Sequence, residues 1–207
     1  DLTTVPIPAP ALLPIIVLLP LLGGIINGLF GKSLSRQTVY AISNGAVLTS
    51  FLLACTVFWQ LSHGGPEDGF RFQLYQWIAA GKYTFDIAFL ADHLSSILLL
   101  VVTGVGFLVH LYSTGYMDEE PGYARYFAYL NLFIFSMLML VLGKNLAMLF
   151  IGWEGVGACS YLLIGFWYKD MEKAEAGQKA FVVNRVGDIG FVVAIFMLLG
   201  YAGGSVD

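Results

Sequence analysis

Six long blocks of apolar residues dominate this sequence, and each is long enough to cross the hydrocarbon core of a bilayer. A membrane span needs about 20 mostly apolar residues. Backbone N–H and C=O groups find no water inside lipid, so each block must be helical. The sequence therefore predicts an all-α polytopic membrane protein with six transmembrane helices, over residues of about 10–30, 38–61, 92–112, 126–142, 145–168 and 180–201.

The polar content of the chain excludes a soluble globule. Of the 207 residues, 58% are hydrophobic and only 12% are charged, about half the charged share of an ordinary soluble domain. We expect residues 1–207 to form a single membrane domain. The net charge of −4 is spread over loops, which gives no indication of nucleic-acid binding. Cys55 and Cys159 lie in different apolar blocks with no C-x-x-C spacing, so no iron–sulfur or zinc site is expected.

Residues 62–91 form an extramembrane segment with a different pattern. Two runs of alternating apolar and polar residues, 70–77 and 83–89, flank Ala79-Ala80-Gly81-Lys82. This alternation predicts a short β-hairpin on the outer membrane surface, between the second and third helices. An amphipathic interfacial stretch is the alternative.

The distribution of basic residues predicts the orientation of the helices. Cytoplasmic loops are enriched in Lys and Arg. Six cations belong to the loops after the first, third and fifth spans: Lys32, Arg36, Arg125, Lys169, Lys173 and Lys179. The opposite side carries Arg71, Lys82 and Lys144. We therefore expect the N-terminus and the hairpin to face outward.

Three ionisable residues lie well inside the predicted spans: Glu154 in the fifth, and Arg185 and Asp188 in the sixth. A charge at the centre of a bilayer costs about 2.5–3.5 kcal/mol on insertion scales, and such residues usually belong to ion or proton paths. A cation that approaches or leaves Glu154 would change its proton affinity. The alternative is a protonated, purely structural Glu154 that is hydrogen-bonded to a neighbouring helix.

Two further expectations carry open alternatives. Arg185 and Asp188 are three residues apart, so they share a helix face. They form either a structural salt bridge or a pair that opens and re-forms with other helices. His110 lies near the cytoplasmic end of the third span, where a proton relay and a snorkelling structural histidine are equally compatible with the sequence.

Four stretches resemble one family. They are 104–110 (GVGFLVH), 122–133 (GYARYFAYLNLF), 152–166 (GWEGVGACSYLLIGF) and 179–188 (KAFVVNRVGD). They look like the antiporter-like proton-pumping subunits of respiratory complex I, the subunit L or chain 5 type, and the resemblance covers essentially the whole chain. It implies a subunit of a proton-translocating NADH:quinone oxidoreductase in which Glu154, Arg185, Asp188 and His110 take part in proton transfer or coupling.

The resemblance also implies partners and a location. Members hold no redox cofactor or metal of their own, since NAD, FMN, iron–sulfur clusters and quinone belong to partner subunits. The expected partners are other membrane-arm subunits, chiefly the neighbouring antiporter-like subunit, and lipids. The expected location is the bacterial plasma membrane or the mitochondrial inner membrane. Members are about three times longer, so this chain matches the N-terminal part, and the lysine that pairs with the glutamate is expected after Asp207.

Two other functions remain open at this point. A related multi-subunit cation/proton antiporter would share the spans and the buried glutamate, but would work without a redox partner. A truncated chain that serves only as a scaffold would carry no protons, because half of each charge switch would be missing.

Overall fold

The computed structural model describes residues 8–80 and 83–201, which form six helices and one β-hairpin. All six helices are long and apolar enough to cross a membrane, which confirms the predicted fold class. The bounds are α1 Ala9–Phe30, α2 Arg36–Ser62, α3 His93–Tyr116, α4 Tyr123–Leu142, α5 Leu146–Ile164 and α6 Met171–Tyr201, with β1 Phe70–Ala80 and β2 Tyr83–Ala91 between α2 and α3.

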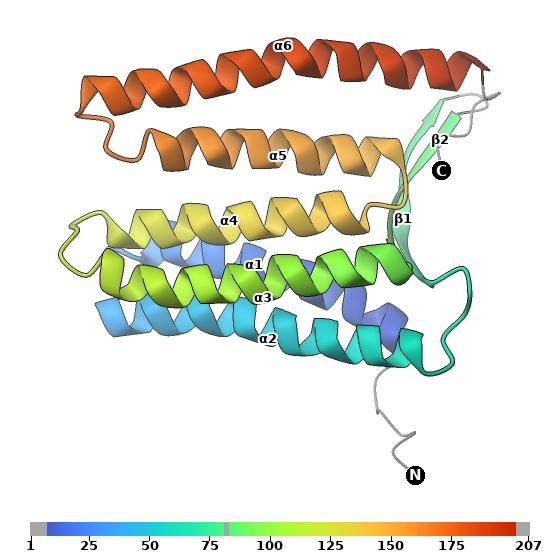
Figure 1. The fold of residues 1–207 in the computed structure, drawn as a ribbon, viewed down its shortest axis with the longest axis horizontal. Helices are drawn as coiled ribbons and strands as arrows, with labels where there is room; N and C mark the ends of the chain where they lie inside the picture. Colours follow the sequence, from blue (N-terminus) through green and yellow to red (C-terminus); the bar gives the residue numbers. More distant parts are fainter. Residues whose placement is uncertain (1–7, 81–82, 202–207) are drawn as a thin grey trace.

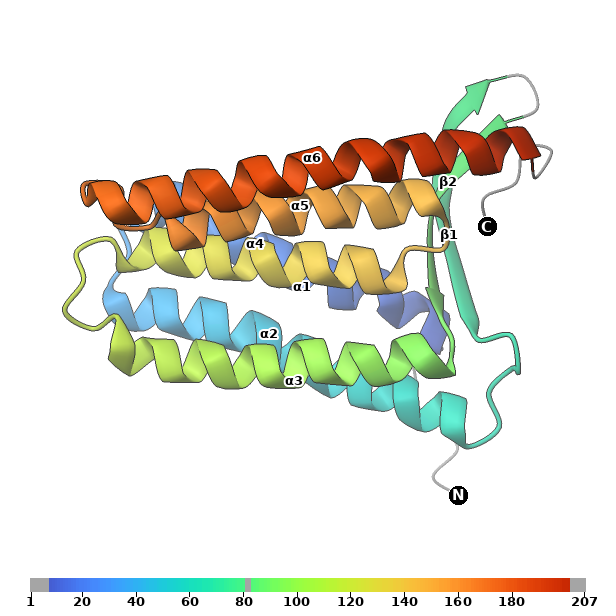
Figure 2. The same ribbon diagram turned by 45° about the horizontal axis from the view of Figure 1, so that its top comes forward.

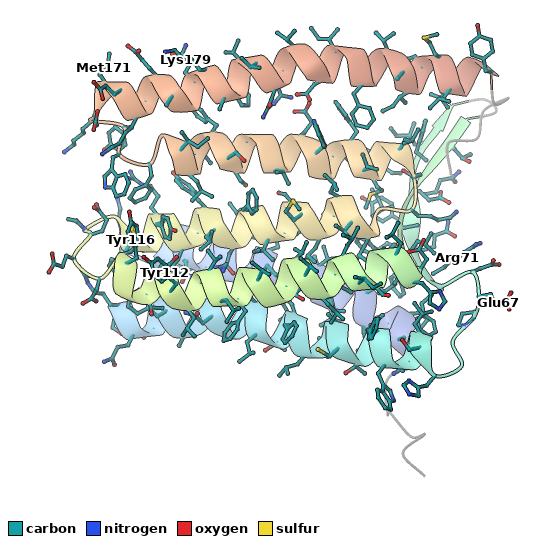
Figure 3. All side chains as sticks on the ribbon, viewed as in Figure 1. Glu67, Arg71, Tyr112, Tyr116, Met171 and Lys179 are labelled. Atoms are coloured by element: carbon teal, nitrogen blue, oxygen red, sulfur yellow. The ribbon has the colours of Figure 1, made fainter. Side chains whose placement is uncertain are left out.

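The helices run side by side, with α4 in the middle of the bundle (Figure 1). Helix α4 contacts α1, α2, α3 and α5, whereas α6 packs along α5 at the edge. The connections α1–α2, α3–α4 and α5–α6 lie at one end of the bundle, which we call the loop end (Figures 1 and 2). The hairpin lies at the opposite end, which we call the hairpin end. Labelled side chains in Figure 3 mark the two ends, with Tyr116 and Lys179 at the first and Arg71 at the second.

Three helix ends differ from the sequence prediction. Helix α3 continues to Tyr116, and α6 begins at Met171. Helix α5 ends at Ile164, just before Gly165. Hydropathy marks only the lipid-soluble part of a helix, so the polar first turns of α6 were invisible to it although they are helical.

Neutral polar side chains join α1, α2 and α4 inside the bundle. Ser43 accepts hydrogen bonds from Asn27 Nδ2 at 2.7 Å and from Asn131 Nδ2 at 2.8 Å. All three residues are buried. A buried polar group without a partner is costly, so this three-residue junction fixes how the three helices meet.

The hairpin is antiparallel, as predicted, and β2 is anchored to the loop between α4 and α5. The backbone N–H of Lys144 donates to Ala88 O at 3.0 Å, and Asn145 Nδ2 donates to Asp86 O at 2.9 Å. The strand register shifts twice, between Gln73 and Tyr75 and between Gln76 and Ile78. The simple alternation in the sequence did not show these irregularities. The expected turn at Gly81 and Lys82 lies outside the described residues.

Asp92 caps the first turn of α3. Its carboxylate accepts the Ser95 N–H at 2.7 Å, while Ser95 Oγ accepts the Asp92 N–H at 2.8 Å. The hydrogen bond from the Ser95 backbone is the main reason that the pKa of Asp92 lies below its ordinary value of 3.8, and the Ser95 hydroxyl and the Leu94 backbone lower it further. The ionised cap therefore stabilises the folded protein above the ordinary pKa, and this stabilisation is lost as the pH falls through the lowered one.

We expect Asp92→Ala to cost about 0.5–2 kcal/mol of stability at neutral pH, because the first turn of α3 loses its acceptor. Asp92→Asn is the matched control, since asparagine caps equally well without a charge. Melting temperatures in detergent, taken at neutral pH and below pH 3.8, give the measurement. A wild-type advantage over the alanine variant that does not shrink in acid would contradict the charge-dependent part of the cap.

Candidate functional site

The structure brings Glu154, Arg185 and Asp188 together between α5 and α6. Arg185 Nη1 pairs with Glu154 Oε2 across the two helices, and with Asp188 Oδ2 at 3.3 Å along α6. The side chains of Glu154, Arg185 and Asp188 are 27%, 38% and 8% exposed. Arg185 therefore pairs both with Asp188 and with another helix, whereas the sequence left these two partners as alternatives. We call these three residues the charge cluster.

Trp153 completes the surroundings of the cluster. Its indole Nε1 donates a hydrogen bond to Asp188 Oδ1 at 2.7 Å. The two oxygens of Asp188 thus receive donors from different sources, one from Arg185 on α6 and one from Trp153 on α5. The guanidinium carbon Cζ of Arg185 lies 4.6 Å from the centroid of the Phe181 ring. The sequence analysis did not identify Trp153, although its position next to Glu154 in an apolar block was the available signal.

The charges in the cluster do not sum to zero. When both carboxylates are ionised, two negative charges share one guanidinium, so one negative charge is left over. Burial disfavours that state unless a proton or another cation compensates it. A cluster of this kind can gain or lose a proton without any bond to carbon being made or broken.

Gly152 and Gly155, which flank Glu154, lie against α4. A Cβ on Gly152 would lie 2.5 Å from the Leu140 backbone N, and one on Gly155 would lie 2.5 Å from Ser136 Oγ. These glycines let the backbones of α4 and α5 approach closely, on a different side of α5 from the charge cluster.

His110 lies apart from the charge cluster. It is fully buried on α3, and its Nδ1 is 2.8 Å from Gly106 O. Its Nε2 is buried with no hydrogen-bond partner in the described part of the chain. Helix α4 lies between α3 and α5 (Figures 1 and 2). Because its side chain is fully buried, His110 does not snorkel to an interface; its part in proton transfer stays a prediction.

Two family sequence profiles match this chain. Residues 77–127 match the one described as NADH-ubiquinone oxidoreductase (complex I), chain 5 N-terminus. Residues 143–207 match the one described as NADH:quinone oxidoreductase/Mrp antiporter, TM. The second match contains the entire charge cluster.

Curated relatives are NADH-quinone oxidoreductase subunits L. The protein of Neisseria meningitidis is 44% identical over 192 residues, which are 92% of this chain and 28% of the relative. The Pseudomonas aeruginosa protein is 45% identical over 90% of this chain and 31% of its own length. The Mycobacterium tuberculosis protein is 43% identical over 91% and 31%. This chain therefore spans less than a third of the length of these relatives.

A solved structure shares the fold. It is described as that of the membrane-bound sulfane sulfur reductase, an archaeal respiratory membrane complex. One of its chains superposes with a TM-score of 0.78 over 94% of this chain and 37% of that chain, at 21% identity. At this identity the likeness establishes the fold alone.

The close contact between α4 and α5 yields a prediction. Gly152→Ala puts a methyl group against the Leu140 backbone, so we expect a loss of about 1–3 kcal/mol, typical of overpacking. Gly157→Ala is the matched control on the same helix, because a Cβ there meets nothing within 4 Å. We expect that control to be neutral or slightly stabilising. Melting temperatures in detergent compare the two, and equal values would contradict the α4–α5 contact.

The charge cluster yields a second prediction. Arg185→Leu leaves two carboxylates without their cation, so we expect a marked drop in melting temperature. Fully buried pairs lose about 3–5 kcal/mol when one partner is removed, and the loss here is smaller because Arg185 is partly exposed. Adding Glu154→Gln and Asp188→Asn to that variant should recover most of the loss.

Lys179→Leu is the control for charge removal on α6, since Lys179 lies near the loop end with a 79% exposed side chain. We expect its melting temperature to match the wild type. If the triple variant melts no higher than Arg185→Leu alone, the loss does not come from unpaired carboxylates.

Proposed function

This chain belongs to the family of antiporter-like subunits of complex I, the subunit L or chain 5 type, and on that premise we propose that it is part of a proton-translocating NADH:quinone oxidoreductase. It would serve in the membrane arm of that assembly. Its relatives bear the name NADH-quinone oxidoreductase subunit L, and both family profiles carry the name of this oxidoreductase.

The observation that carries the proposal is the charge cluster. Arg185 contacts Glu154 on α5 and Asp188 on α6 at the same time. Ionisable residues inside a membrane bundle usually mark ion or proton paths, because their burial is expensive. Proton movement is the chemistry that such a cluster supports.

The proposed mechanism is a shift of Arg185 between its two partners. While the guanidinium pairs with Glu154, its positive charge keeps that carboxylate in the ionised form. When the guanidinium leaves Glu154 and keeps only its contact with Asp188, Glu154 loses its cation and takes up a proton instead. The reverse movement expels the proton. Trp153 acts as a positioning residue, because its hydrogen bond at 2.7 Å keeps Asp188 oriented toward the guanidinium.

Redox chemistry belongs to other subunits in this proposal. NAD, FMN, iron–sulfur clusters and quinone would bind to partner subunits, and electron transfer there would drive the movement of charges here. The proposed neighbours are membrane-arm subunits, chiefly the adjacent antiporter-like subunit. The proposed location is the bacterial plasma membrane or the mitochondrial inner membrane, in which this multi-pass chain would be embedded.

His110 has a separate place in the proposal. It is too deeply buried to exchange protons with water directly, and α4 separates it from the charge cluster. Its unpaired Nε2 can accept a proton from a neighbouring group or an enclosed water. We therefore assign it to a path through α3 and α4, distinct from the Glu154 switch.

A related cation/proton antiporter is the second candidate. The profile over residues 143–207 is shared by NADH:quinone oxidoreductase and Mrp antiporter proteins. Co-purification of flavin and iron–sulfur subunits would favour the first function. Proton exchange driven by Na⁺ in vesicles, without those subunits, would favour the second.

Glu154→Gln in the full-length protein should lower proton pumping by at least about tenfold while the assembly and its NADH oxidation with an added electron acceptor persist. The amide has the size of the carboxylic acid, but it cannot exchange the proton. Pumping is measured with a pH-sensitive dye in vesicles, and assembly by native gel electrophoresis.

Glu175→Gln is the matched control. Glu175 is another carboxylate, but it lies near the start of α6 and is well exposed. Its Oε2 is 4.0 Å from Lys179 Nζ. We expect this variant to pump like the wild type. Unchanged pumping and quinone-linked turnover in Glu154→Gln would remove Glu154 from the proton path.

A further inference from the structure

The loop end of the bundle contains a hollow of about 570 Å³, which we call the interfacial pocket. All three connections at that end contribute residues to it. Lys32 comes from the α1–α2 connection, Glu120 from the α3–α4 connection, and Trp167 and Lys169 from the α5–α6 connection. Three segments that are far apart in sequence thus converge where the apolar helices end.

Positive charge prevails in the interfacial pocket. Asp170 is paired with Lys173 at 3.1 Å, and Glu120 accepts the Trp167 indole N–H at 3.0 Å. The structure shows no ion pair for Lys32 or Lys169 within residues 8–80 and 83–201. The cations that line the pocket are Lys32, Arg125, Lys169 and Lys173, and the carboxylates are Glu120 and Asp170. Four positive and two negative groups leave an excess of two positive charges.

Arg125 is held in place with an unused donor. Its Nη2 donates to Phe166 O at 3.2 Å. Its guanidinium lies 4.7 Å from the Phe166 ring centroid and 5.1 Å from that of Tyr168. Its Nε is buried and has no hydrogen-bond partner in the described part of the chain. The rings and the carbonyl hold the guanidinium, and no carboxylate among the described residues forms an ion pair with it.

The interfacial pocket adjoins a second hollow between α4 and α5. This hollow has a volume of about 150 Å³ and shares Arg125, Phe166 and Tyr168 with the pocket. This second hollow reaches Tyr129 and Tyr161, one helical turn closer to the middle of α4 and α5. Tryptophan and tyrosine at helix ends are typical of the headgroup level of a membrane, and Trp167 and Tyr168 are exposed there. A cationic hollow thus shares lining residues with a groove between α4 and α5.

We propose that the interfacial pocket binds the phosphate headgroup of an anionic glycerophospholipid, with Arg125, Lys32 and Lys169 facing the phosphate. One acyl chain lies along the groove past Tyr129 and Tyr161. Basic pockets between membrane helices are suited to such headgroups, and a guanidinium binds phosphate oxygens through charge-assisted hydrogen bonds. The groove into the hydrocarbon layer distinguishes a lipid from a free anion. This site is independent of the proposed proton switch.

The test uses the full-length protein in its purified assembly, stripped of lipid and titrated with phosphatidylglycerol or phosphatidylcholine, with bound lipid counted by native mass spectrometry. We expect the wild type to bind one phosphatidylglycerol at least about tenfold more tightly than phosphatidylcholine. The double variant Lys32→Gln/Lys169→Gln should lose about tenfold of that affinity, since both lysines form charge-assisted contacts. Both are exposed, so the variant should fold even if Arg125→Gln does not.

Lys179→Gln is the matched control, since it removes one cation near the loop end outside the pocket, and it should bind like the wild type. Glycerol 3-phosphate and inorganic phosphate should not displace the lipid. Displacement by either would show a free-anion site and overturn the proposal. Equal affinity for phosphatidylcholine, or equal binding by all variants, would also overturn it.

Discussion

A charge at hydrocarbon depth has to be neutralised by its immediate neighbours, and this constraint organises the edge of the bundle. Arg185 meets the requirement twice, with Glu154 on α5 and Asp188 on its own helix. Three aromatic pairs also join α6 to α5, since Phe191 lies beside Phe150 and Trp153, and Phe181 lies beside Tyr161. The charge cluster and the hydrogen bond from Trp153 add polar contacts to this apolar packing. A helix that depends on charge pairing responds to any change in those charges.

On the opposite side of the bundle, the buried polar groups are neutral and are satisfied by hydrogen bonds. Asn27, Ser43 and Asn131 share hydrogen bonds at the meeting point of α1, α2 and α4. Their interaction does not depend on protonation, so this side keeps its geometry when charges move elsewhere. Helix α4 lies between these two sides of the bundle. It carries Asn131 on one side, and on the other its Leu140 backbone packs against Gly152 of α5.

Much of the fold follows from the sequence, because hydrocarbon leaves the backbone few alternatives to a helix. The candidate residues Glu154, Arg185 and Asp188 were equally visible, since ionisable groups stand out in apolar blocks. Their partners were not. The spacing of three places Asp188 beside Arg185, but the rotation of α5 that brings Glu154 to the same guanidinium is a property of packing. The burial of His110 was not predicted because it depends on how α3 packs against α4, where the ring lies beside Phe127. The hydrogen bond of Trp153 likewise depends on a rotamer that no periodicity encodes.

The unequal lengths of neighbouring helices have a consequence for the bilayer. Helix α5 has 19 residues, about 28 Å at 1.5 Å per residue, whereas α6 has 31, or about 46 Å. A hydrocarbon core of about 30 Å exceeds the first and falls far short of the second. The excess length of α6 belongs to its polar first turns, which carry Glu172, Lys173, Glu175 and Lys179 and can extend into water at the loop end. The helix that carries Glu154 therefore fits the hydrocarbon core with no length to spare, whereas its neighbour extends past the core on one side.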